Sequence, residues 1–265
     1  MKDLVSFAMV GAGRLAWSLL PALQQAGLQC EAILSRNVAQ ALRLSSAYHV
    51  PVASDLSGIP SSQIIFLVVS DAAIASVAAL VAPRLRPDQM LVHCSGSVPL
   101  AALGDHPSRG VLYPMQAFTQ DAMVSFQESP VPLFVEGSDP VITEQLLALA
   151  ARLSPLFQVM VSETRKKLHL GAVMVSNFTN LLFRLAVEVV PEVDLHMYEP
   201  LIRHQVEQAM RLGPVAAQTG PAIRGDMPTI KEHLRLLGNR PELASLYWLL
   251  SLQINPSLSE NHGEI

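Results

Sequence analysis

The sequence is poor in charge and carries no long basic run. Of its 265 residues 15% are charged, and the net charge of −4 comes from both signs spread along the chain. The longest basic cluster is residues 165–167. So weak a basic signal argues against nucleic acid as a partner. Half of the residues are hydrophobic, which excludes a disordered chain and allows the core of a two-domain protein.

Cysteines and membrane-spanning patterns are also scarce. The two cysteines, Cys30 and Cys94, each lie in an apolar, strand-like run, which favours buried free thiols over a disulfide and fits a reducing cytosol. Arg14 interrupts the apolar N-terminal stretch where a signal peptide would continue. The uncharged stretch 72–83 is too short for a bilayer, which needs about 20 residues. We therefore expect a cytoplasmic protein with no membrane segment.

The first 160 residues alternate between short β-rich apolar runs and Ala/Leu-rich helical runs. This alternation is typical of a buried parallel sheet. Strands are predicted over residues 5–10, 29–34, 64–69, 90–93, 111–113, 133–135 and 158–161. Helices are predicted over residues 15–26, 38–47, 72–80 and 143–152. The pattern predicts an α/β, doubly wound Rossmann domain in residues 1–160.

After about residue 162 the strand signal ends and helical spacing takes over. Helices are predicted over residues 165–190, 200–212, 229–237 and 242–253. The first of these is apolar through most of its middle, which favours a buried central helix that forms the floor of an interdomain cleft. Residues 161–265 are therefore predicted to form an all-helical domain for substrate binding and dimerisation.

The strongest local signal is a glycine turn directly after the first predicted strand. Gly11 permits the tight turn, and Gly13 lets a pyrophosphate approach the backbone, while a small residue at position 16 allows close helix packing. The helix that follows offers free amides and a positive dipole end. A strand before and a helix after favour a dinucleotide site over an ordinary turn, with cofactor contacts from Gly11, Ala12, Gly13, Arg14 and Leu15.

The end of the second predicted strand bears on the choice of cofactor. NAD sites usually have an acid there, but this chain has Ser35, Arg36 and Asn37. A guanidinium beside neutral hydrogen-bonding groups suits the 2′-phosphate of NADP, so Ser35 and Arg36 are predicted cofactor contacts. The alternative is that Arg36 is a solvated loop residue. Glu31 is an acid in the same strand, but it lies near the strand's start.

Polar residues also follow the next two strands. The carboxyl ends of strands in doubly wound sheets line the ligand crevice. We therefore expect Val69, Ser70 and Ser95 to contact the cofactor. Ser95, Gly96 and Ser97 are the candidates for contact with the substrate.

Two residues nearby have plain structural interpretations. Asp71 belongs to the polar segment that should face the crevice, but it also precedes a predicted helix that starts at Ala72, and aspartate is a favoured N-cap. His93 falls within a strand, where a hydrogen-bonded core histidine is more common than a catalyst.

Four polar residues interrupt the apolar pattern of the long helix: Lys166, His169, Asn177 and Asn180. Eleven residues separate Lys166 from Asn177 and His169 from Asn180, so each pair shares a face after about three turns. Polar groups on a buried helix need partners, and a ligand cavity supplies them. The spacing favours Lys166 or His169 as proton donor, Asn177 as the residue that orients the substrate oxygen, and Asn180 as a further substrate contact. An interdomain hydrogen-bond network is the alternative.

The segment 219–226 combines glycines, a proline and two opposite charges. Its composition predicts a fixed loop. Arg224 either forms an ion pair with Asp226 that braces the loop or presents its guanidinium to a substrate carboxylate. The sequence leaves both open.

Five segments together resemble a known family. They are residues 10–16, 93–97, 113–118, 166–172 with 176–178, and 219–226. They are similar to the Rossmann-like oxidoreductases that carry the domain of unknown function 2520, and the match runs in order along nearly the whole chain.

That family is similar to the 6-phosphogluconate dehydrogenase-like superfamily, with its β-hydroxyacid dehydrogenases, ketopantoate reductases, pyrroline-carboxylate reductases and deazaflavin-dependent NADP reductases. The resemblance implies an NADP-linked reductase, commonly a homodimer, whose helical domain shapes the substrate site. In β-hydroxyacid dehydrogenases the catalytic Lys and Asn stand four apart on one helix, whereas Leu170 follows Lys166 at that spacing here. His169 therefore stays a rival proton donor. Tyr113 stands where many members have a histidine before the proline.

The sequence thus predicts a cytoplasmic, homodimeric oxidoreductase that passes hydride between NADPH and a small 2-oxo acid such as ketopantoate. No metal is predicted. One alternative is a non-catalytic dinucleotide sensor or scaffold that keeps the Rossmann site, because fold does not fix function. The other is an imine reductase of the pyrroline-carboxylate type.

Overall fold

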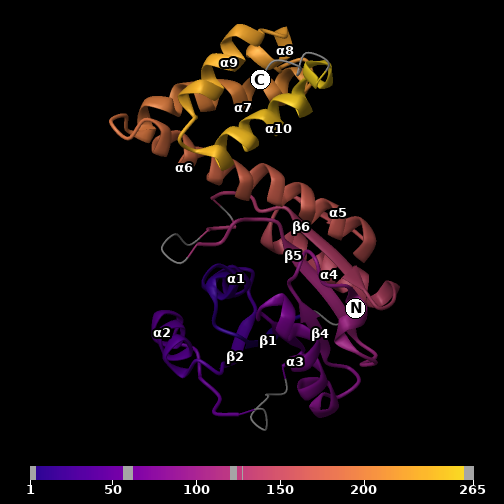
Figure 1. Cartoon of the computed structure of the whole chain (residues 1–265). Coiled ribbons are helices and arrows are strands. Elements are labelled where there is room, and N and C mark those ends of the chain that lie inside the picture. Colours follow the sequence, from indigo (N-terminus) through magenta and orange to yellow (C-terminus); the bar gives the residue numbers. More distant parts are fainter. Residues whose placement is uncertain (1–3, 56–61, 120–123, 127, 260–265) are drawn as a thin grey trace. The chain divides into compact units, whose positions relative to one another are not determined.

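A computed structural model describes residues 4–55, 62–119, 124–126 and 128–259 of the chain (Figure 1). The chain forms two compact units, Met1–Leu181 and Leu182–Ile265. The first unit contains a seven-stranded sheet of order β2-β1-β3-β4-β5-β6-β7. The second unit is helical in its described part.

The sheet is parallel except where β6 runs antiparallel to β5. Its strands are β1 (Ser6–Val10), β2 (Gln29–Leu34), β3 (Ile64–Leu67), β4 (Met90–His93), β5 (Arg109–Pro114), β6 (Leu133–Gly137) and β7 (Phe157–Val159). The neighbours of β1 are β2 on one side and β3 on the other, so the chain reverses its winding direction at β1. The predicted doubly wound α/β class is therefore confirmed.

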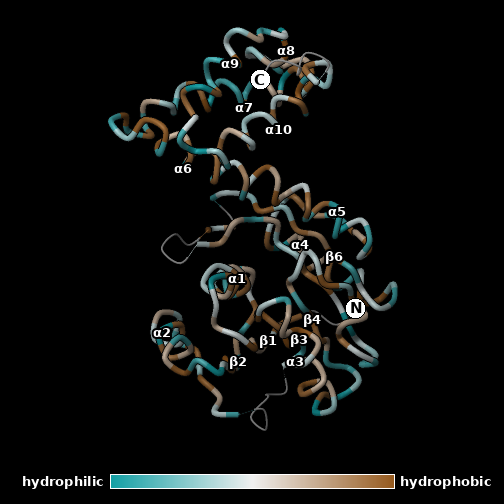
Figure 2. Tube along the Cα trace, in the orientation of Figure 1, coloured by the Kyte–Doolittle hydropathy of each residue, from teal (hydrophilic) through white to brown (hydrophobic). Residues whose placement is uncertain are grey.

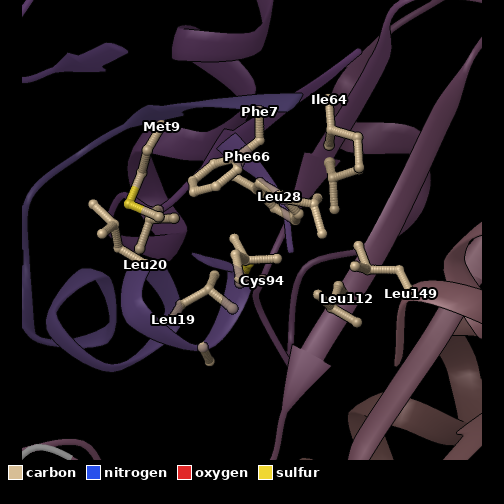
Figure 3. Close-up of a cluster of buried hydrophobic side chains, with 14 of the residues drawn as sticks. Phe7, Met9, Leu19, Leu20, Leu28, Ile64, Phe66, Cys94, Leu112 and Leu149 are labelled. Carbon is tan, nitrogen blue, oxygen red and sulfur yellow. The ribbon is translucent and has the colours of Figure 1, made fainter. Parts of the chain in front are cut away.

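Helices cover both faces of the sheet. On one face lie α1 (Arg14–Gln25), α2 (Val38–Tyr48) and α4 (Pro140–Leu153), whose apolar residues join a single core cluster with alternate residues of β1, β3 and β5. Figure 3 shows part of this cluster, in which the rings of Phe7 and Phe66 meet edge to face at 6.0 Å. On the other face η2 (Asp71–Ala73) leads into α3 (Ile74–Val81), which packs on the remaining residues of β1 and β3. Burial on both faces explains why the strands read as continuous apolar runs.

Both cysteines are free and buried, as the sequence predicts. Burial raises the pKa of Cys30 and of Cys94 to about 12, so both thiols stay protonated at neutral pH.

The second unit contains η6 (Leu195–Tyr198), α7 (Glu199–Leu212), α8 (Pro221–Arg224), α9 (Met227–Leu236) and α10 (Pro241–Ile254). Its core is small and centres on Ala222, Ile230 and Leu258. Side chains of α10 pack around these three residues, among them Tyr247 and Trp248.

The boundary between the compact units differs from the predicted domain boundary at residue 160. It lies within a long helix made of α5 (Ser162–Val173), the π-helical turn η5 (Met174–Phe178) and α6 (Thr179–Val189). The first part of this helix belongs to the Rossmann unit because α5 packs on the sheet: Leu168 lies against Val111, Tyr113 and Phe134.

The expectation that this long helix is a buried central one is wrong for the described chain. Arg165 is the buried residue of α5, and none of the residues of η5 or α6 is buried. Apolar positions recur along the helix (Figure 2). The helix Ser162–Val189 is long and apolar enough to cross a membrane by length and composition alone, and a single helix of this kind is weak evidence for a membrane span. An apolar composition indicates that a helix buries its surface against something, but it does not show which part of the protein, or which partner, packs against it.

Candidate functional site

The turn between β1 and α1 can only be built with glycine at its first position. Gly11 has φ of +114°, and a Cβ there would lie 2.1 Å from the backbone oxygen of Val68. A Cβ on Gly13 would instead meet no atom within 4 Å, so open space lies beside this backbone. Gly13 is also the N-cap of α1 and gives no side-chain hydrogen bond to the first turn. The free amides of that turn suit an anion such as a pyrophosphate.

A cavity of about 310 Å³ extends from this turn along the carboxyl ends of β3 and β4. Its lining residues are Gly13, Arg14, Leu15, Leu67, Val68, Val69, Ser70, Asp71, Cys94 and Ser95. The structure thus gathers most of the predicted cofactor contacts around one space. Four predicted contacts do not line it: Gly11, Ala12, Ser35 and Arg36. Ala12 is buried in the core cluster. An open glycine backbone at an uncapped helix start fits the pyrophosphate of a dinucleotide.

In the loop after β2, Ser35 and Asn37 form hydrogen bonds within the fold, whereas Arg36 is exposed. The Oδ1 of Asn37 accepts from the amide of Gln40 at 3.1 Å and so caps α2. The Oγ of Ser35 accepts from the amide of Asn37 at 3.2 Å. Arg36 is exposed between them. Glu31 accepts from the hydroxyl of Ser62 at 2.8 Å and is engaged in the fold, so Arg36 is the charged group at the ligand end of β2.

The loop after β4 is tied to the loop after β3. The Oγ of Ser97 donates to Asp71 Oδ2 at 2.5 Å. The Oγ of Ser95 accepts from the amides of Ser97 and Val98, both at 3.1 Å. The N-cap interpretation of Asp71 is wrong: η2 starts at Asp71, and Ser70 is its N-cap. The Asp71 carboxylate binds Ser97 of the neighbouring loop because the adjacent parallel strands β3 and β4 end beside one another here.

His93 is fully buried at the end of β4 and is only half satisfied. Its Nδ1 accepts from the amide of Ser95 at 3.2 Å, while its Nε2 has no hydrogen-bond partner among the described residues. Burial and the nearby Arg165 guanidinium lower the pKa of His93 to about 4, so the ring is neutral at pH 7. The expected hydrogen-bonded core histidine is therefore a buried ring with one unsatisfied nitrogen.

Tyr113 and His169 form a pair at the end of β5. The Tyr113 hydroxyl lies 3.0 Å from His169 Nδ1, and the two rings meet edge to face. Gly96 lies against this pair, since a Cβ there would come within 2.7 Å of both rings. Burial, together with the Asp71 carboxylate, raises the pKa of Tyr113, although the Arg165 guanidinium opposes this. The phenol therefore keeps its proton at neutral pH.

A buried ion pair fixes the start of α5. Arg165 is fully buried, contacts Glu136 through Nη1, and donates through Nη2 to the carbonyl of Val98 at 2.6 Å. Ser162 Oγ donates to Glu136 at 2.7 Å and accepts from the amide of Leu100 at 3.0 Å. These bonds hold α5 against β6 and against the loop after β4. His169 follows Arg165 by about one turn, so the same contacts position the histidine.

A second cavity, of about 640 Å³, lies beside the Tyr113 and His169 pair. Its lining residues are Tyr113, Met115, Gln116, Ala117, Lys167, Leu168, His169, Gly171, Ala172, Val173, Val175, Ser176 and Asn177. The wall is mostly apolar, with one cation and several hydrogen-bonding groups. It has the character of a site for a small anionic molecule that also carries apolar groups.

The π-helical turn changes which predicted residues meet in this cavity. Lys166 pairs with Glu163 at 3.1 Å and does not line the cavity, whereas its neighbour Lys167 does. His169 and Asn177 line it, and Asn180 does not. The predicted pairs assumed 3.6 residues per turn throughout. The wider turn of η5 rotates the residues after it relative to those before it, so Asn180 no longer shares a face with His169. Such turns are frequent at functional sites.

Arg224 lies in the second unit. Its guanidinium approaches Asp226 at 3.8 Å, which is the bracing ion pair, while the side chain stays largely exposed. The segment around it forms the short helix α8, and Gly225 closes that helix in the left-handed conformation. Asp226 caps α9 by accepting from the amide of Thr229 at 3.2 Å.

The site contains residues for which the sequence analysis predicted no catalytic or binding role: Tyr113, Arg165 and Lys167. Tyr113 ends a predicted parallel strand, so the rule that ligands bind at the carboxyl ends of strands pointed to it. Arg165 gave no such signal, because a buried arginine in a basic run looks like a solvated one. Among the described residues, no group of three or more His, Cys, Asp or Glu could hold a metal.

The glycine turn and the cavity at the strand ends define the Rossmann class of dinucleotide-binding folds. Residues 131–254 match the Domain of unknown function (DUF2520). A putative NADP oxidoreductase from Bacteroides fragilis is 34% identical, with a TM-score of 0.88 over 96% of this chain and 98% of that one. The chain belongs to the same family as this protein.

Two further solved structures are similar. A protein from Thermotoga maritima is 25% identical, with a TM-score of 0.72 over 92% of this chain and 97% of that one. An imine reductase from Myxococcus stipitatus in complex with NADP⁺ is 17% identical, with a TM-score of 0.68 over 98% of this chain and 96% of that one; this likeness concerns the fold alone. Among curated proteins, none matches the chain.

Proposed function

We propose that the protein is an NADP-dependent oxidoreductase that passes hydride between NADPH and a small 2-oxo acid such as ketopantoate. The observation that carries this proposal is the wall shared by the two cavities. Ser95 lines the dinucleotide cavity, and the next residue, Gly96, lies against the Tyr113 and His169 pair of the second cavity. Hydride transfer requires such adjacency, because the two reacting carbons must come into contact.

The preference for NADP is supported by Arg36. It is exposed at the end of β2, where NAD-binding folds usually hold an acid that binds the ribose hydroxyls. Its planar guanidinium can bind two oxygens of a 2′-phosphate. The Bacteroides fragilis relative is described as an NADP oxidoreductase, which agrees with this assignment.

Bound at the glycine turn and along Ser70 and Ser95, NADPH would supply the hydride for the carbonyl carbon of the substrate. The carbonyl oxygen then needs one proton, and His169 lines the cavity with a ring that Tyr113 holds at 3.0 Å. Lys167 offers a cation for the substrate carboxylate, and Asn177 offers an amide for the substrate oxygen. Lys166 is the weaker candidate for proton donor because it pairs with Glu163 outside the cavity.

The test is to mix purified protein with NADPH and a panel of 2-oxo acids and cyclic imines, and to follow NADPH absorbance. We expect oxidation of NADPH with a 2-oxo acid. Oxidation with cyclic imines alone would favour an imine reductase. Binding of NADPH without turnover of any substrate would favour the sensor.

The cofactor assignment has its own test. We expect Arg36→Asp to reduce the preference for NADPH over NADH, measured as the ratio of kcat/KM values, by at least about tenfold. An unchanged ratio would show that the 2′-phosphate binds elsewhere. Lys167→Ala provides a comparison, because loss of this cation should raise the KM of an anionic substrate and leave the preference for NADPH as it is.

We also propose that the protein is cytoplasmic and works as a homodimer. The buried reduced thiols of Cys30 and Cys94 are consistent with a reducing compartment. The exposed apolar side chains Leu170, Met174 and Val175 of the long helix are a surface that a second copy would cover. Light scattering coupled to gel filtration tests the dimer directly.

A further inference from the structure

The carboxylate of Asp71 has no assigned role, yet it lies in the dinucleotide cavity. The strand order places the loop after β2 on one side of the glycine turn and the ends of β3 and β4 on the other. With the pyrophosphate at Gly13 and Arg36 on the ribose phosphate, the adenosine half lies toward β2. The nicotinamide half then extends toward Ser70, Asp71 and Ser95.

In the described chain a hydrogen bond from Ser97, and not an ion pair, holds the Asp71 carboxylate in place there. It accepts the Ser97 hydroxyl at 2.5 Å, and no ion pair to it is found among the described residues. The side chain is exposed and lines the cavity. Two cations lie in this region: Arg165 is paired with Glu136, and Arg14 lines the same cavity beside Gly13.

We propose that Asp71 makes the site bind the oxidised dinucleotide more tightly, relative to the reduced one, than it otherwise would. This inference rests on the proposed function. The nicotinamide ring gains a positive charge when it gives up hydride, and a fixed negative charge beside it stabilises the charged form. Reduced cofactor bound at this site is therefore a stronger hydride donor than it would be without this charge, which favours reduction of the substrate.

The test compares the dissociation constants of NADPH and NADP⁺ on full-length protein. NADPH binding is followed by its fluorescence, and NADP⁺ binding by displacement of NADPH in the same assay. We expect Asp71→Asn to weaken NADP⁺ binding relative to NADPH by about fivefold to tenfold. A tenfold change corresponds to about 30 mV in the two-electron potential of the bound cofactor.

Three further variants test whether the effect comes from the charge of Asp71, from its hydrogen bond to Ser97, or from the net charge of the protein. Asp71→Glu keeps the carboxylate. The ratio of the NADPH dissociation constant to the NADP⁺ dissociation constant should therefore stay within about twofold of the wild-type value. Ser97→Ala removes the hydroxyl that binds Asp71 but keeps the charge, so the ratio should not fall. Asp88→Asn removes an exposed carboxylate before β4, at the opposite edge of the sheet, and should leave the ratio unchanged.

The results of these binding experiments distinguish failure of the proposed function from failure of the role of Asp71. If wild-type protein binds neither dinucleotide, the proposed function fails and this inference fails with it. If both bind and Asp71→Asn leaves their ratio unchanged, or if Ser97→Ala lowers it as much as Asp71→Asn does, the role of the Asp71 charge is refuted while the proposed function stands.

Discussion

The two cavities of the Rossmann unit are built in different ways. The dinucleotide cavity begins at a backbone turn where Gly11 alone fits and where Gly13 leaves open space. The second cavity is formed by side chains of β5 and of the long helix, including a π-helical turn. A backbone site suits a ligand common to many proteins, whereas a side-chain site changes with each substitution. If the protein has the proposed function, the second cavity determines its substrate.

The largest effect is expected at the glycine turn. Gly11→Ala places a methyl group 2.1 Å from the Val68 oxygen at a φ that disfavours side chains, so we expect a loss of roughly 3 kcal/mol or more in unfolding free energy. Urea denaturation measures it. Gly13→Ala is the matched control: its methyl group enters open space, so stability should change by less than about 1 kcal/mol while NADPH affinity falls. Equal loss of stability in both variants would contradict the distinction.

Next in size is the proton donor of the second cavity. Removal of a general acid lowers turnover by about 10² to 10⁴, so His169→Gln should lower kcat by at least about 100-fold. Lys166→Ala removes an exposed ion pair with Glu163 and should change kcat by less than about twofold. Steady-state kinetics with the best 2-oxo acid decide between them. The reverse ranking would return the role to Lys166.

The buried His93 predicts a loss of stability in acid. Burial lowers its pKa from the ordinary value of 6.5 to about 4 in the folded protein, so the unfolded chain binds more protons between these pH values. Stability is full above about pH 6.5 and falls as pH decreases toward 4, by up to roughly 3 kcal/mol. Urea denaturation at about pH 7, 5.5 and 4.5 measures this slope. His93→Gln should flatten it, and an equally steep slope in that variant would assign the effect to other groups.

The smallest effect is expected for the partner of His169. Tyr113→Phe removes one hydrogen bond and keeps the ring that lies against Gly96, so we expect kcat to fall about tenfold with little change in stability. Comparison of kcat with KM shows whether the phenol positions the histidine or binds substrate. A rise in KM with unchanged kcat would assign Tyr113 to substrate binding.

The sequence predicted the Rossmann unit well for a physical reason. Each strand buried on both faces leaves an unbroken apolar run, and the turn after β1 needs glycine whatever the ligand. The long helix was predicted less well. Its apolar composition indicated burial that the described chain does not provide. The π-helical turn rotated Asn180 out of the predicted phase, whereas Lys166, which precedes this turn, pairs with Glu163 outside the cavity. Single-sequence periodicity assumes a regular helix and cannot register such a turn.

By itself the sequence determined the fold class and the position of the glycine turn, because both depend on local backbone chemistry and on the pattern of apolar residues. Only the tertiary structure decided that Asp71 meets Ser97, that Tyr113 meets His169, and that Arg165 lies buried against Glu136. These pairs are 26, 56 and 29 residues apart in the chain. The first two pairs meet because parallel strands bring their carboxyl ends to one edge of the sheet and α5 packs beside that edge. Glu136 instead lies on antiparallel β6, opposite Val111 of β5, where α5 begins. No spacing in the sequence encodes this proximity.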